Sequence, residues 1–583
     1  MLRPDPPAAA LLVLGVVLIL NNSCQEQQAG YPIDSKVLTT LDRTIVPSPL
    51  PTLPVSILPD EITKFSQLGY GVWNYGPGLG FQKRLDIMPP AYADSLVTKS
   101  SKLLSFFAMT DIHLTDKESP GEAVFFGLPP FNVISAYSPA MLYSTHVLDA
   151  AVQTVNALHK ENKFDFGIAL GDVCNNTQYN ELRWLIDIFD GKNINPDSGI
   201  KDDPTPGPNN DYQDEYKAAG LDQSIPWYIA LGNHDHFWLG TNPMNDYIRQ
   251  TLIGDSILRM GNIFSPGGFD LRDYYVGVID GRTPYGNIIG AGPVKSASAP
   301  KIAADPNRRS LSKKEWMNEF FNTTSGPAGH GFNKIDAAGE FAGYTFEPKS
   351  DLPARVIVLD NTQTDNDPDV HGYGHGTLDQ ARYEWLVSEL DKGQKEGKLI
   401  IIAAHVPIGV EPPGSFVGWW SEAYLTEAAL IAKLHTYPNL LLWIAGHRHL
   451  NTVTPFASPD VNHPELGFWE IETSSLREFP QQFRTFEIVR NSDNTISIFT
   501  ADVDPAVKEG SLAAKSRSYA IAARQIFKLP LVLLPSGSVS YNAELVKQLS
   551  AEMQAKIRNY GTTISNQSMS NYGLRSRPTP PAF

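Results

Sequence analysis

The sequence predicts a mixed α/β protein, and two observations support this fold class. From Leu103 onward, short apolar runs of strand length alternate with longer segments whose apolar residues recur at helical spacing. Most of these apolar runs are followed at once by polar side chains, as at the ends of buried strands. Hydrophobic residues make up 42% of the 583 residues and aromatic residues 10%, so the chain can bury a sizeable core and is not disordered throughout.

The expected elements follow from these runs in chain order. Buried strands are expected over 103–109, 164–170, 225–231, 354–359, 399–403 and 440–444, and helices over 139–160, 179–189, 380–390 and 422–435. Thr377-Leu-Asp-Gln380 resembles a capping box, which would open the third helix. Runs over 468–473, 483–489 and 495–500 alternate in polarity and predict antiparallel strands. Helices are expected again around 513–527 and 543–560.

The expected organisation has four segments. A targeting signal over 1–24 precedes an irregular, Pro-rich lead-in over 25–102, and the main domain spans 103–504. Two insertions interrupt this domain, at 191–224 and 237–350, and a helical extension with a polar tail covers 505–583. Loops as long as these insertions are usually functional or disordered.

The residue pattern at the N-terminus predicts an export signal. Ala8 to Leu20 is an uninterrupted apolar run, long enough for the core of a signal peptide and short of the roughly 20 residues that a membrane span needs. Ser23-Cys24 follows, and this order resembles a bacterial lipoprotein signal, in which the cysteine becomes lipidated. The alternatives are an ordinary secretory signal and an uncleaved anchor. We therefore expect an exported protein, in the bacterial periplasm or anchored to a membrane through lipid on Cys24.

Charge and cysteine content exclude other classes. The chain holds 47 Lys and Arg against 63 Asp and Glu, a net charge of −16, so no nucleic-acid partner is expected. Cys24 and Cys174 are its two cysteines, which excludes a disulfide framework. We expect Cys174 to be a packed thiol.

Residues of the types that bind metals follow five of the expected strands. They are Asp111 and His113, then Asp172, then Asn233 and His234, then His405, and finally His447 and His449. Because ligands bind at the carboxyl ends of the strands in open α/β sheets, these side chains should converge at one edge. Each motif alone has an ordinary structural explanation. Five such motifs, each directly after one of five expected strands, indicate a metal site, because a buried polar residue without a partner is costly.

The ordered set Asp-x-His, Gly-Asp, Gly-Asn-His-Asp, His and Gly-His-x-His resembles the calcineurin-like metallophosphoesterases. The resemblance implies a four-layer sandwich of two mixed β-sheets flanked by helices, with a dinuclear metal centre. The segment Thr110 to Leu114 is most similar to the branch that contains the class III cyclic-nucleotide phosphodiesterases. Gly171 to Asn175 lacks the tyrosine that purple acid phosphatases carry in this motif.

The resemblance also implies a set of metal ligands. Asp111, His113 and His449 would hold one metal, Asn233, His405 and His447 the other, and Asp172 would bridge the two. Carboxylate, imidazole and amide ligands suit two divalent or mixed-valence transition metal ions, namely Fe, Mn or Zn. Such a pair of metals generates the hydroxide that attacks the phosphorus atom.

Other residues receive roles by the same comparison. His234 would bind a phosphate oxygen or protonate the leaving group. Asn175 stands where many family members carry an aspartate that orients this histidine; its amide can hydrogen-bond the imidazole but cannot stabilise its cation as a carboxylate does. Arg477 follows an expected strand end, which makes it a candidate for substrate binding, and the alternative is an ordinary surface arginine. His371 and His375 could bind a metal or substrate, but we expect them to belong to a mobile, Gly-rich loop.

The sequence thus predicts an exported, metal-dependent phosphoesterase that hydrolyses a small phosphomonoester or phosphodiester. A nucleotidase and a phospholipid-headgroup hydrolase are alternatives that would share the metal centre. A non-enzymatic scaffold would require missing ligands, and every expected ligand is present. The insertion over 237–350 begins beside His234 and is expected to cap the site, with Tyr247, Tyr274, Tyr275 and Tyr285 available to stack on a substrate.

Overall fold

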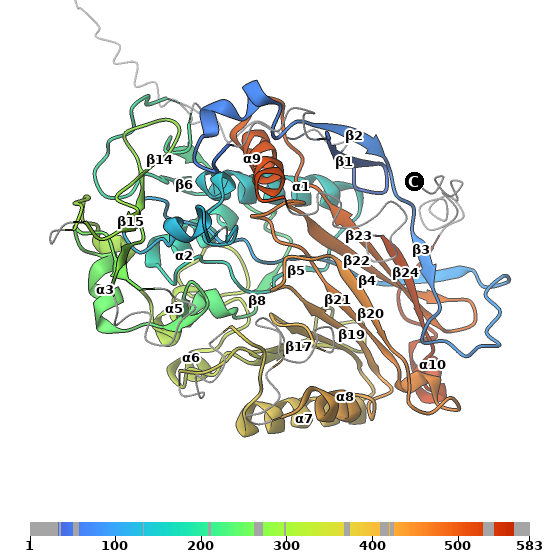
Figure 1. Cartoon of the computed structure of the whole chain (residues 1–583). Helices are drawn as coiled ribbons and strands as arrows, with labels where there is room; N and C mark the ends of the chain where they lie inside the picture. Colours follow the sequence, from blue (N-terminus) through green and yellow to red (C-terminus); the bar gives the residue numbers. More distant parts are fainter. Residues whose placement is uncertain are drawn as a thin grey trace, which may run out of the picture.

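Two mixed β-sheets form the centre of the protein (Figure 1). The structure is a computed structural model that describes residues 33, 37–49, 57–131, 133–207, 211–261, 272–295, 299–365, 374–408, 419, 425–528 and 542–564. The targeting signal, Cys24 and His371 lie outside these residues. None of the described helices has both the length and the apolar character that a membrane span needs.

The first sheet has eight strands. In order they are β3 (Gln82–Arg84), β24 (Ala543–Lys547), β23 (Ile496–Val503), β22 (Phe483–Asn491), β4 (Lys99–Met109), β5 (Phe166–Ala169) and β8 (Trp227–Ile229), with β25 (Thr562–Thr563) paired to β4. Strands β4, β5 and β8 run parallel, whereas β22 is antiparallel to β4. The parallel part therefore brings the ends of three strands to one edge.

The second sheet has six strands. In order they are β16 (Tyr344–Phe346), β17 (Ala354–Leu359), β18 (Leu399–Ala404), β19 (Leu440–Ala445), β21 (Phe468–Glu472) and β20 (Thr452–Phe456). Strands β17, β18, β19 and β21 are parallel, and the two outer strands are antiparallel to their neighbours. The prediction of an antiparallel strand over 468–473 is thus right for its pairing with β20 and wrong for its pairing with β19.

The central strands of the second sheet, β17, β18 and β19, are buried on both faces because they are almost entirely apolar. Along β17, Val356 and Val358 join the large core that both sheets share, whereas Ile357 and Leu359 join a separate core on the other face. Successive side chains of a strand point to opposite faces, so a continuous apolar run suits a sheet covered on both sides.

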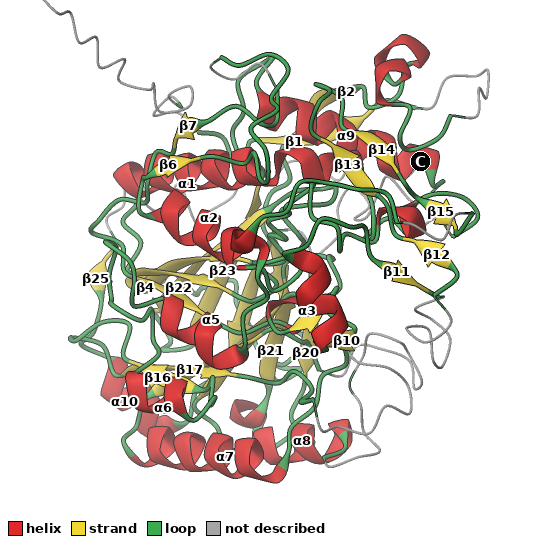
Figure 2. Cartoon of the chain, turned by 90° about the vertical axis from the view of Figure 1, so that its left-hand side faces the viewer, coloured by secondary structure: helices red, strands yellow, loops and turns green. Residues whose placement is uncertain are grey.

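Helices cover the two outer faces, which gives four layers. The longer helices are α1 (Ser144–Glu161), α2 (Tyr179–Phe189), α7 (Gln380–Lys395), α8 (Glu427–Leu434) and α9 (Leu512–Ile526). Figure 1 shows α1 and α9 on one side of the sheets and α7 and α8 on the other, and Figure 2 shows the same order from the side. The expected α/β sandwich of two mixed sheets flanked by helices is confirmed.

The insertions and the lead-in hold short elements. Their strands are β1 (Arg43–Pro47), β2 (Trp73–Pro77), β6 (Asn193–Ile194), β7 (Tyr216–Lys217), β9 (Phe237–Trp238), β10 (Asn242–Pro243), β11 (Arg259–Met260), β12 (Tyr274–Tyr275), β13 (Val278–Asp280), β14 (Asn287–Ile289) and β15 (Gly292–Pro293). The short helices are α3 (Asp246–Leu252), α5 (Lys313–Glu319), α6 (Lys334–Ala338) and α10 (Ala551–Ile557). The lead-in is therefore not irregular throughout, because it supplies β1, β2 and β3.

Two predictions of local structure are wrong. Helix α7 begins after Asp379, whose carboxylate accepts the backbone N–H of Arg382, so Asp379 is the N-cap and Thr377 is not. The expected helix over 543–560 is instead strand β24 followed by α10. Strand β24 pairs with β23 on one side and β3 on the other, and this pairing decides its conformation.

Candidate metal centre

The predicted ligands converge because the strands that precede them end at one place. Strands β4, β5 and β8 lead into Asp111, Asp172 and Asn233, and strands β18 and β19 lead into His405 and His447. Backbone hydrogen bonds extend the pairing past the strand ends, from Asp111 N to Gly171 O at 3.1 Å and from Gly446 N to His405 O at 2.9 Å. The loops that carry the ligands are therefore tied to one another.

The backbone at these positions is unusual. Five of the seven predicted ligands have positive φ angles, namely Asp111 (49°), His113 (46°), Asp172 (50°), His447 (78°) and His449 (58°). Non-glycine residues adopt this region uncommonly and at a cost, and such residues cluster at functional sites. This backbone conformation redirects each side chain at the end of its strand toward the other predicted ligands.

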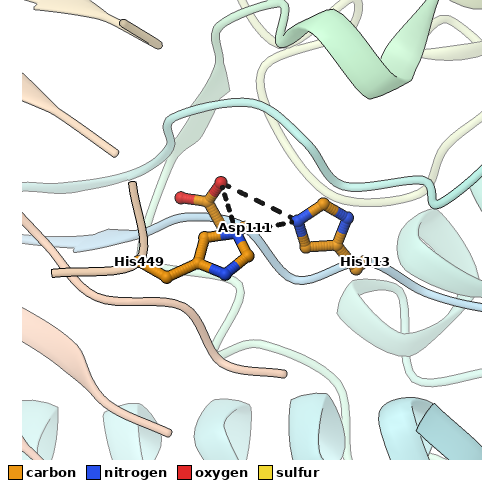
Figure 3. A group of neighbouring side chains, drawn as sticks. All are labelled: Asp111, His113 and His449. Carbon is orange, nitrogen blue, oxygen red and sulfur yellow. Dashed lines mark hydrogen bonds and ion pairs between the residues drawn. The ribbon is translucent and has the colours of Figure 1, made fainter. Parts of the chain in front are cut away.

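Asp111, His113 and His449 form the first group. Nε2 of His449 lies 3.3 Å from Oδ1 of Asp111 and 3.1 Å from Nε2 of His113. Figure 3 shows the Asp111 carboxylate facing the ring nitrogens of both histidines. All three side chains are buried or nearly so. The structure therefore brings together the three residues predicted to hold one metal.

Asn233, His405 and His447 form the second group with Asp172. Oδ1 of Asn233 lies 2.9 Å from Nε2 of His405 and 3.1 Å from Nδ1 of His447. The other atom of this amide, Nδ2, donates to the carbonyl of Gly240 at 3.0 Å, which turns the amide oxygen toward the histidines. The amide is thus oriented as a metal ligand requires.

Asp172 lies between the two groups. Its Oδ2 is 3.2 Å from Nε2 of His405 and 3.9 Å from Nε2 of His113, so one oxygen faces a histidine of each group. Its Oδ1 accepts the backbone N–H of His234 at 2.8 Å. This is the position that a bridging carboxylate would occupy.

Contacts with residues outside the two ligand groups orient the rings of His405 and His449. Nδ1 of His405 donates to the carbonyl of Leu170 at 2.8 Å, which directs Nε2 into the site. Nδ1 of His449 lies 3.4 Å from the carboxylate of Glu478, which likewise leaves Nε2 for the site. A carboxylate behind a ligating histidine raises its basicity and fixes its tautomer.

The electrostatics of the site favour positive charge in each group. Burial opposes protonation of His405, but the Asp172 carboxylate outweighs it and raises the pKa of His405 to about 9. Burial also opposes protonation of His449, and Glu478 and Asp111 raise its pKa to about 10. Burial and the neighbouring His405 lower the pKa of His447 to about 3, and the charges of Asp172 and Asp111 offset this only in part. Each group therefore attracts a cation.

The residues fit a pair of metal ions. Oδ1 of Asp111 is buried without a hydrogen-bond partner among the described residues, and such an atom is costly unless something binds it. Candidate groups of ligand atoms within 4.8 Å of one another include Asp111, His113 and His449 as one set and Asp172, His405 and His447 as another. Nitrogen and oxygen donors suit Fe, Mn or Zn.

Two glycines allow the ligand loops to approach closely. A Cβ atom on Gly232 would lie 2.2 Å from Oδ1 of Asp172, and one on Gly446 would lie 2.4 Å from Oδ2 of Asp111. Any side chain at either position would displace a predicted ligand. This steric limit explains why the Gly-Asn-His and Gly-His motifs contain glycine.

His234 is held differently from the sequence prediction. Its Nδ1 donates to the backbone carbonyl of Asn175 at 2.8 Å, not to the amide side chain. The Asn175 amide instead donates to Glu122 at 2.8 Å and accepts from Arg477 at 2.6 Å. His234 also belongs to a candidate ligand group with His113 and Asp172, so it lies at the boundary of the metal centre.

Arg477 lies behind the site. Its side chain is buried, and its guanidinium bonds the Asn175 amide. Arg477 is therefore not a surface arginine. His375 is also buried, and its backbone N–H donates to Gln363 at 2.8 Å, so this part of the Gly-rich segment packs on the domain. Cys174 is a buried thiol, as expected.

The tyrosines of the long insertion serve its own packing. Tyr275 is buried in an apolar cluster with residues of the 123–136 segment, and Tyr274 stacks on Phe125. The hydroxyl of Tyr247 donates to the carbonyl of Arg259 at 2.8 Å. Tyr285 is half exposed. The expectation of a set of tyrosines available for stacking on a substrate is therefore wrong for Tyr247, Tyr274 and Tyr275.

Asp235 and Glu478 are functional residues that the sequence prediction missed. The Asp235 carboxylate accepts backbone N–H groups of Gly232 (2.8 Å), Asp172 (3.0 Å), Val173 (3.0 Å) and Cys174 (3.1 Å), and so joins two ligand loops. Asp235 follows His234 directly, so its position in the Gly-Asn-His-Asp motif was a signal that could have identified it. Glu478 carries no such signal, because it lies far from His449 in sequence.

Comparison with known proteins identifies the domain. The model of the calcineurin-like phosphoesterase family matches residues 104–375, which include Asp111, Asp172 and Asn233. His405, His447 and His449 lie outside the matched residues, and the fold brings them next to the ligand residues within the match. No curated protein matches the chain.

Two solved structures are similar to this chain. A dimetal phosphatase from Danio rerio has 11% sequence identity, with 70% of this chain and 97% of that chain covered and a TM-score of 0.35. GAP50, the anchor in the inner membrane complex of Plasmodium, has 12% identity, with 73% and 96% covered and a TM-score of 0.28. The family match and the two groups of ligand residues, without these two structures, show that residues 104–375 belong to a calcineurin-like phosphoesterase domain and that the protein is a metal-dependent hydrolase of phosphoric esters.

Proposed function

We propose that this protein hydrolyses a small phosphomonoester or phosphodiester outside the cytoplasm. The observation that carries the proposal is the position of Asp172, whose Oδ2 faces His113 of one ligand group and His405 of the other. A carboxylate shared in this way suits two metal ions that act on one phosphate.

The described ligand residues would bind two metal ions. Asp111, His113 and His449 would hold one metal, Asn233, His405 and His447 the other, and Asp172 both. When bound, the two metals would lower the pKa of a water molecule and neutralise charge on the phosphate. The protein supplies buried, pre-oriented ligands, because Gly240, Leu170 and Glu478 fix the side chains that would bind.

His234 is the proposed proton donor to the leaving group. With Nδ1–H bonded to the Asn175 carbonyl, the Nε2 atom is left to carry the transferred proton. Its ring packs edge to face against His113, with 4.5 Å between centroids, and this contact supports the proposed role. Arg477 acts through Asn175 as a positioning residue.

The sequence supports a small substrate and an exported protein. The net charge of −16 disfavours a polyanion such as DNA or RNA. The apolar run from Ala8 to Leu20 and the following Cys24 support export and lipid anchoring. The insertion over 237–350 starts at the ligand loop and contacts Asn233 through Gly240, so it borders the site.

A substrate panel tests this function. Metal-free protein is reloaded separately with Mn²⁺, Fe²⁺ and Zn²⁺ and assayed with p-nitrophenyl phosphate, bis-p-nitrophenyl phosphate, a 5′-nucleotide, a cyclic nucleotide, glycerophosphocholine, and single-stranded DNA. We expect one of the small esters to be hydrolysed at least tenfold faster than DNA. Protein that binds two metals and hydrolyses none of the small esters would contradict the proposal.

A further inference from the structure

Glu122 is a buried carboxylate outside the set of predicted metal ligands. It comes from the loop that follows β4, and its side chain is 0% exposed. Its Oε2 accepts a side-chain N–H of Asn175 at 2.8 Å, and its Oε1 accepts a side-chain N–H of Asn176. Burying a charged group is costly unless donors bind it, so these two contacts decide what Glu122 does.

The orientation of both amides is set by groups that can only donate. Oδ1 of Asn175 accepts from Nη1 of Arg477 at 2.6 Å, and a guanidinium has no acceptor atom. Oδ1 of Asn176 accepts the backbone N–H of Leu239 at 3.1 Å. With its oxygen bound to a donor, each amide has to turn its own N–H group toward Glu122. These contacts therefore decide which way each amide is flipped.

The result is a row of hydrogen bonds that requires an acceptor at its centre. The row runs from Arg477 through Asn175 to Glu122, and from there through Asn176 to Leu239. Both ends are donors, and each amide accepts on one side and donates on the other, so the central group must accept on both sides. A carboxylate does this, whereas a glutamine of the same size accepts on one side and donates on the other.

The surroundings of Glu122 act on its charge in both directions. Burial and the charge of Glu181 raise the pKa of Glu122 well above its usual value, although the charge of Arg477 and the hydrogen bond from Asn176 oppose this rise. A proton on either oxygen would meet an N–H group at each amide and find no acceptor there. The hydrogen bonds therefore favour the carboxylate over the neutral acid.

The peptide between Asn175 and Asn176 is the unit that orients His234. Its carbonyl oxygen accepts Nδ1–H of His234 at 2.8 Å, and its N–H, which belongs to Asn176, donates to Glu181 at 2.8 Å. Glu181 also accepts the backbone N–H of Asn175 at 3.1 Å. Glu181 thus holds the main chain of this turn, while Glu122 holds the side chains on both sides of the peptide.

We propose that Glu122 is a positioning residue for proton transfer by His234. By accepting from the side chains on both sides of the Asn175–Asn176 peptide, it fixes the carbonyl that binds Nδ1–H and so directs Nε2 toward the leaving oxygen. This role rests on the proposed function, in which Nε2 of His234 gives its proton to that oxygen. The carboxylate that many family members place at position 175 is here supplied by Glu122, from another loop and behind the Asn175 amide.

Two variants break and then restore the row of hydrogen bonds. In Glu122→Gln the new amide must turn its N–H toward Asn175 or Asn176, so two donors face each other. Adding Asn175→Asp to Glu122→Gln supplies a carboxylate that accepts from Arg477 and from the new amide, which completes the row again. Glu544→Gln is the matched control, because Glu544 is also a buried carboxylate and pairs with Lys99 at the start of β4.

Kinetics and unfolding are measured on the full chain of the wild type and the three variants. The kcat and KM values are compared for matched phenyl and p-nitrophenyl phosphate esters, because the phenolate is the poorer leaving group and needs the proton more. Metal content is determined in each loaded protein. Urea unfolding of the metal-free proteins gives a readout that does not depend on activity.

Glu122→Gln should lower kcat for the phenyl ester by about tenfold or more and for the p-nitrophenyl ester by less than about threefold, with KM and metal content unchanged. It should also raise the unfolding equilibrium constant of the metal-free protein by about tenfold or more, because a buried donor loses its acceptor. Adding Asn175→Asp should reverse most of both effects. Glu544→Gln should leave the ratio of the two kcat values unchanged.

The proposal is overturned if Glu122→Gln matches the wild type, if Asn175→Asp recovers nothing in the Glu122→Gln protein, or if both esters lose activity equally. Activity lost together with a metal ion would also overturn it. Inactivity of the wild type on every ester would instead reject the proposed function, and the unfolding data would still show whether the residue at position 122 must accept from both amides.

Discussion

The backbone carbonyl of Asn175 accepts a hydrogen bond from Nδ1 of His234 at 2.8 Å, while the side-chain amide of Asn175 points to Glu122 and Arg477. The residue that replaces the usual aspartate thus orients the histidine through its main chain. This arrangement explains how the site keeps a fixed imidazole without a carboxylate. It also predicts different effects for substitutions of His234 and of Asn175.

His234→Ala should lower kcat by about 10²–10⁴-fold, because it removes the proton donor to the leaving group. Asn175→Ala keeps the carbonyl and should lower kcat by less than about tenfold. Both variants are assayed with a poor and a good leaving group, and their metal content is measured. The loss for His234→Ala should shrink with the good leaving group. If His234→Ala loses a metal ion, the residue is a ligand and its assigned role is wrong.

Glu478→Ala should weaken metal binding by about 10–100-fold, because the carboxylate behind His449 fixes the tautomer that leaves Nε2 free. Glu478→Gln, which keeps an oxygen acceptor, should have the smaller effect. Metal titration of the stripped protein measures both affinities. Equal affinities in Glu478→Ala and the wild type would show that this contact has no part in metal binding.

The stability of the protein should fall as the pH drops from about 6.5 toward 4, in part because of His330. Burial lowers its pKa to about 4, and its ring stacks on Trp227 with Nδ1 donating to the Trp227 carbonyl. The unfolded chain therefore binds more protons than the folded chain in this window, so stability rises with pH. The pKa difference corresponds to about 3 kcal/mol in the free energy of unfolding.

Urea unfolding at several pH values measures this contribution. His330→Phe should be less stable than the wild type at pH 7, because the hydrogen bond to Trp227 is lost, but its free energy of unfolding should change less between pH 6.5 and 4. The same pH dependence in both proteins would exclude His330 as its source.

Cys24→Ser should release the protein from membranes if lipid on this cysteine anchors it. The wild type, expressed in a Gram-negative host with its own N-terminus, should partition into detergent and incorporate labelled fatty acid. Membrane association that persists in Cys24→Ser without label would instead indicate an uncleaved apolar segment over Ala8 to Leu20.

The fold and most of the site could be predicted because the relevant signals are local. Apolar runs such as 354–359 are buried on both faces, and a ligand motif follows each of five strands. The segment 543–547 could not be assigned, because a short run with both apolar and charged residues suits helix or strand until β23 and β3 pair with it. Glu478 and the main-chain contact of Asn175 depend on the packing of distant loops, which leaves no periodic signal.

The metal content of active protein tests the account most directly. Elemental analysis should find two transition metal ions per chain in the active wild type, and chelation should abolish activity until Mn²⁺, Fe²⁺ or Zn²⁺ is returned. Asp172→Asn should retain fewer than two ions and lose more activity than any other single ligand change, because Asp172 faces both ligand groups. Full activity in protein without a transition metal, or two ions and normal activity in Asp172→Asn, would contradict the central claim.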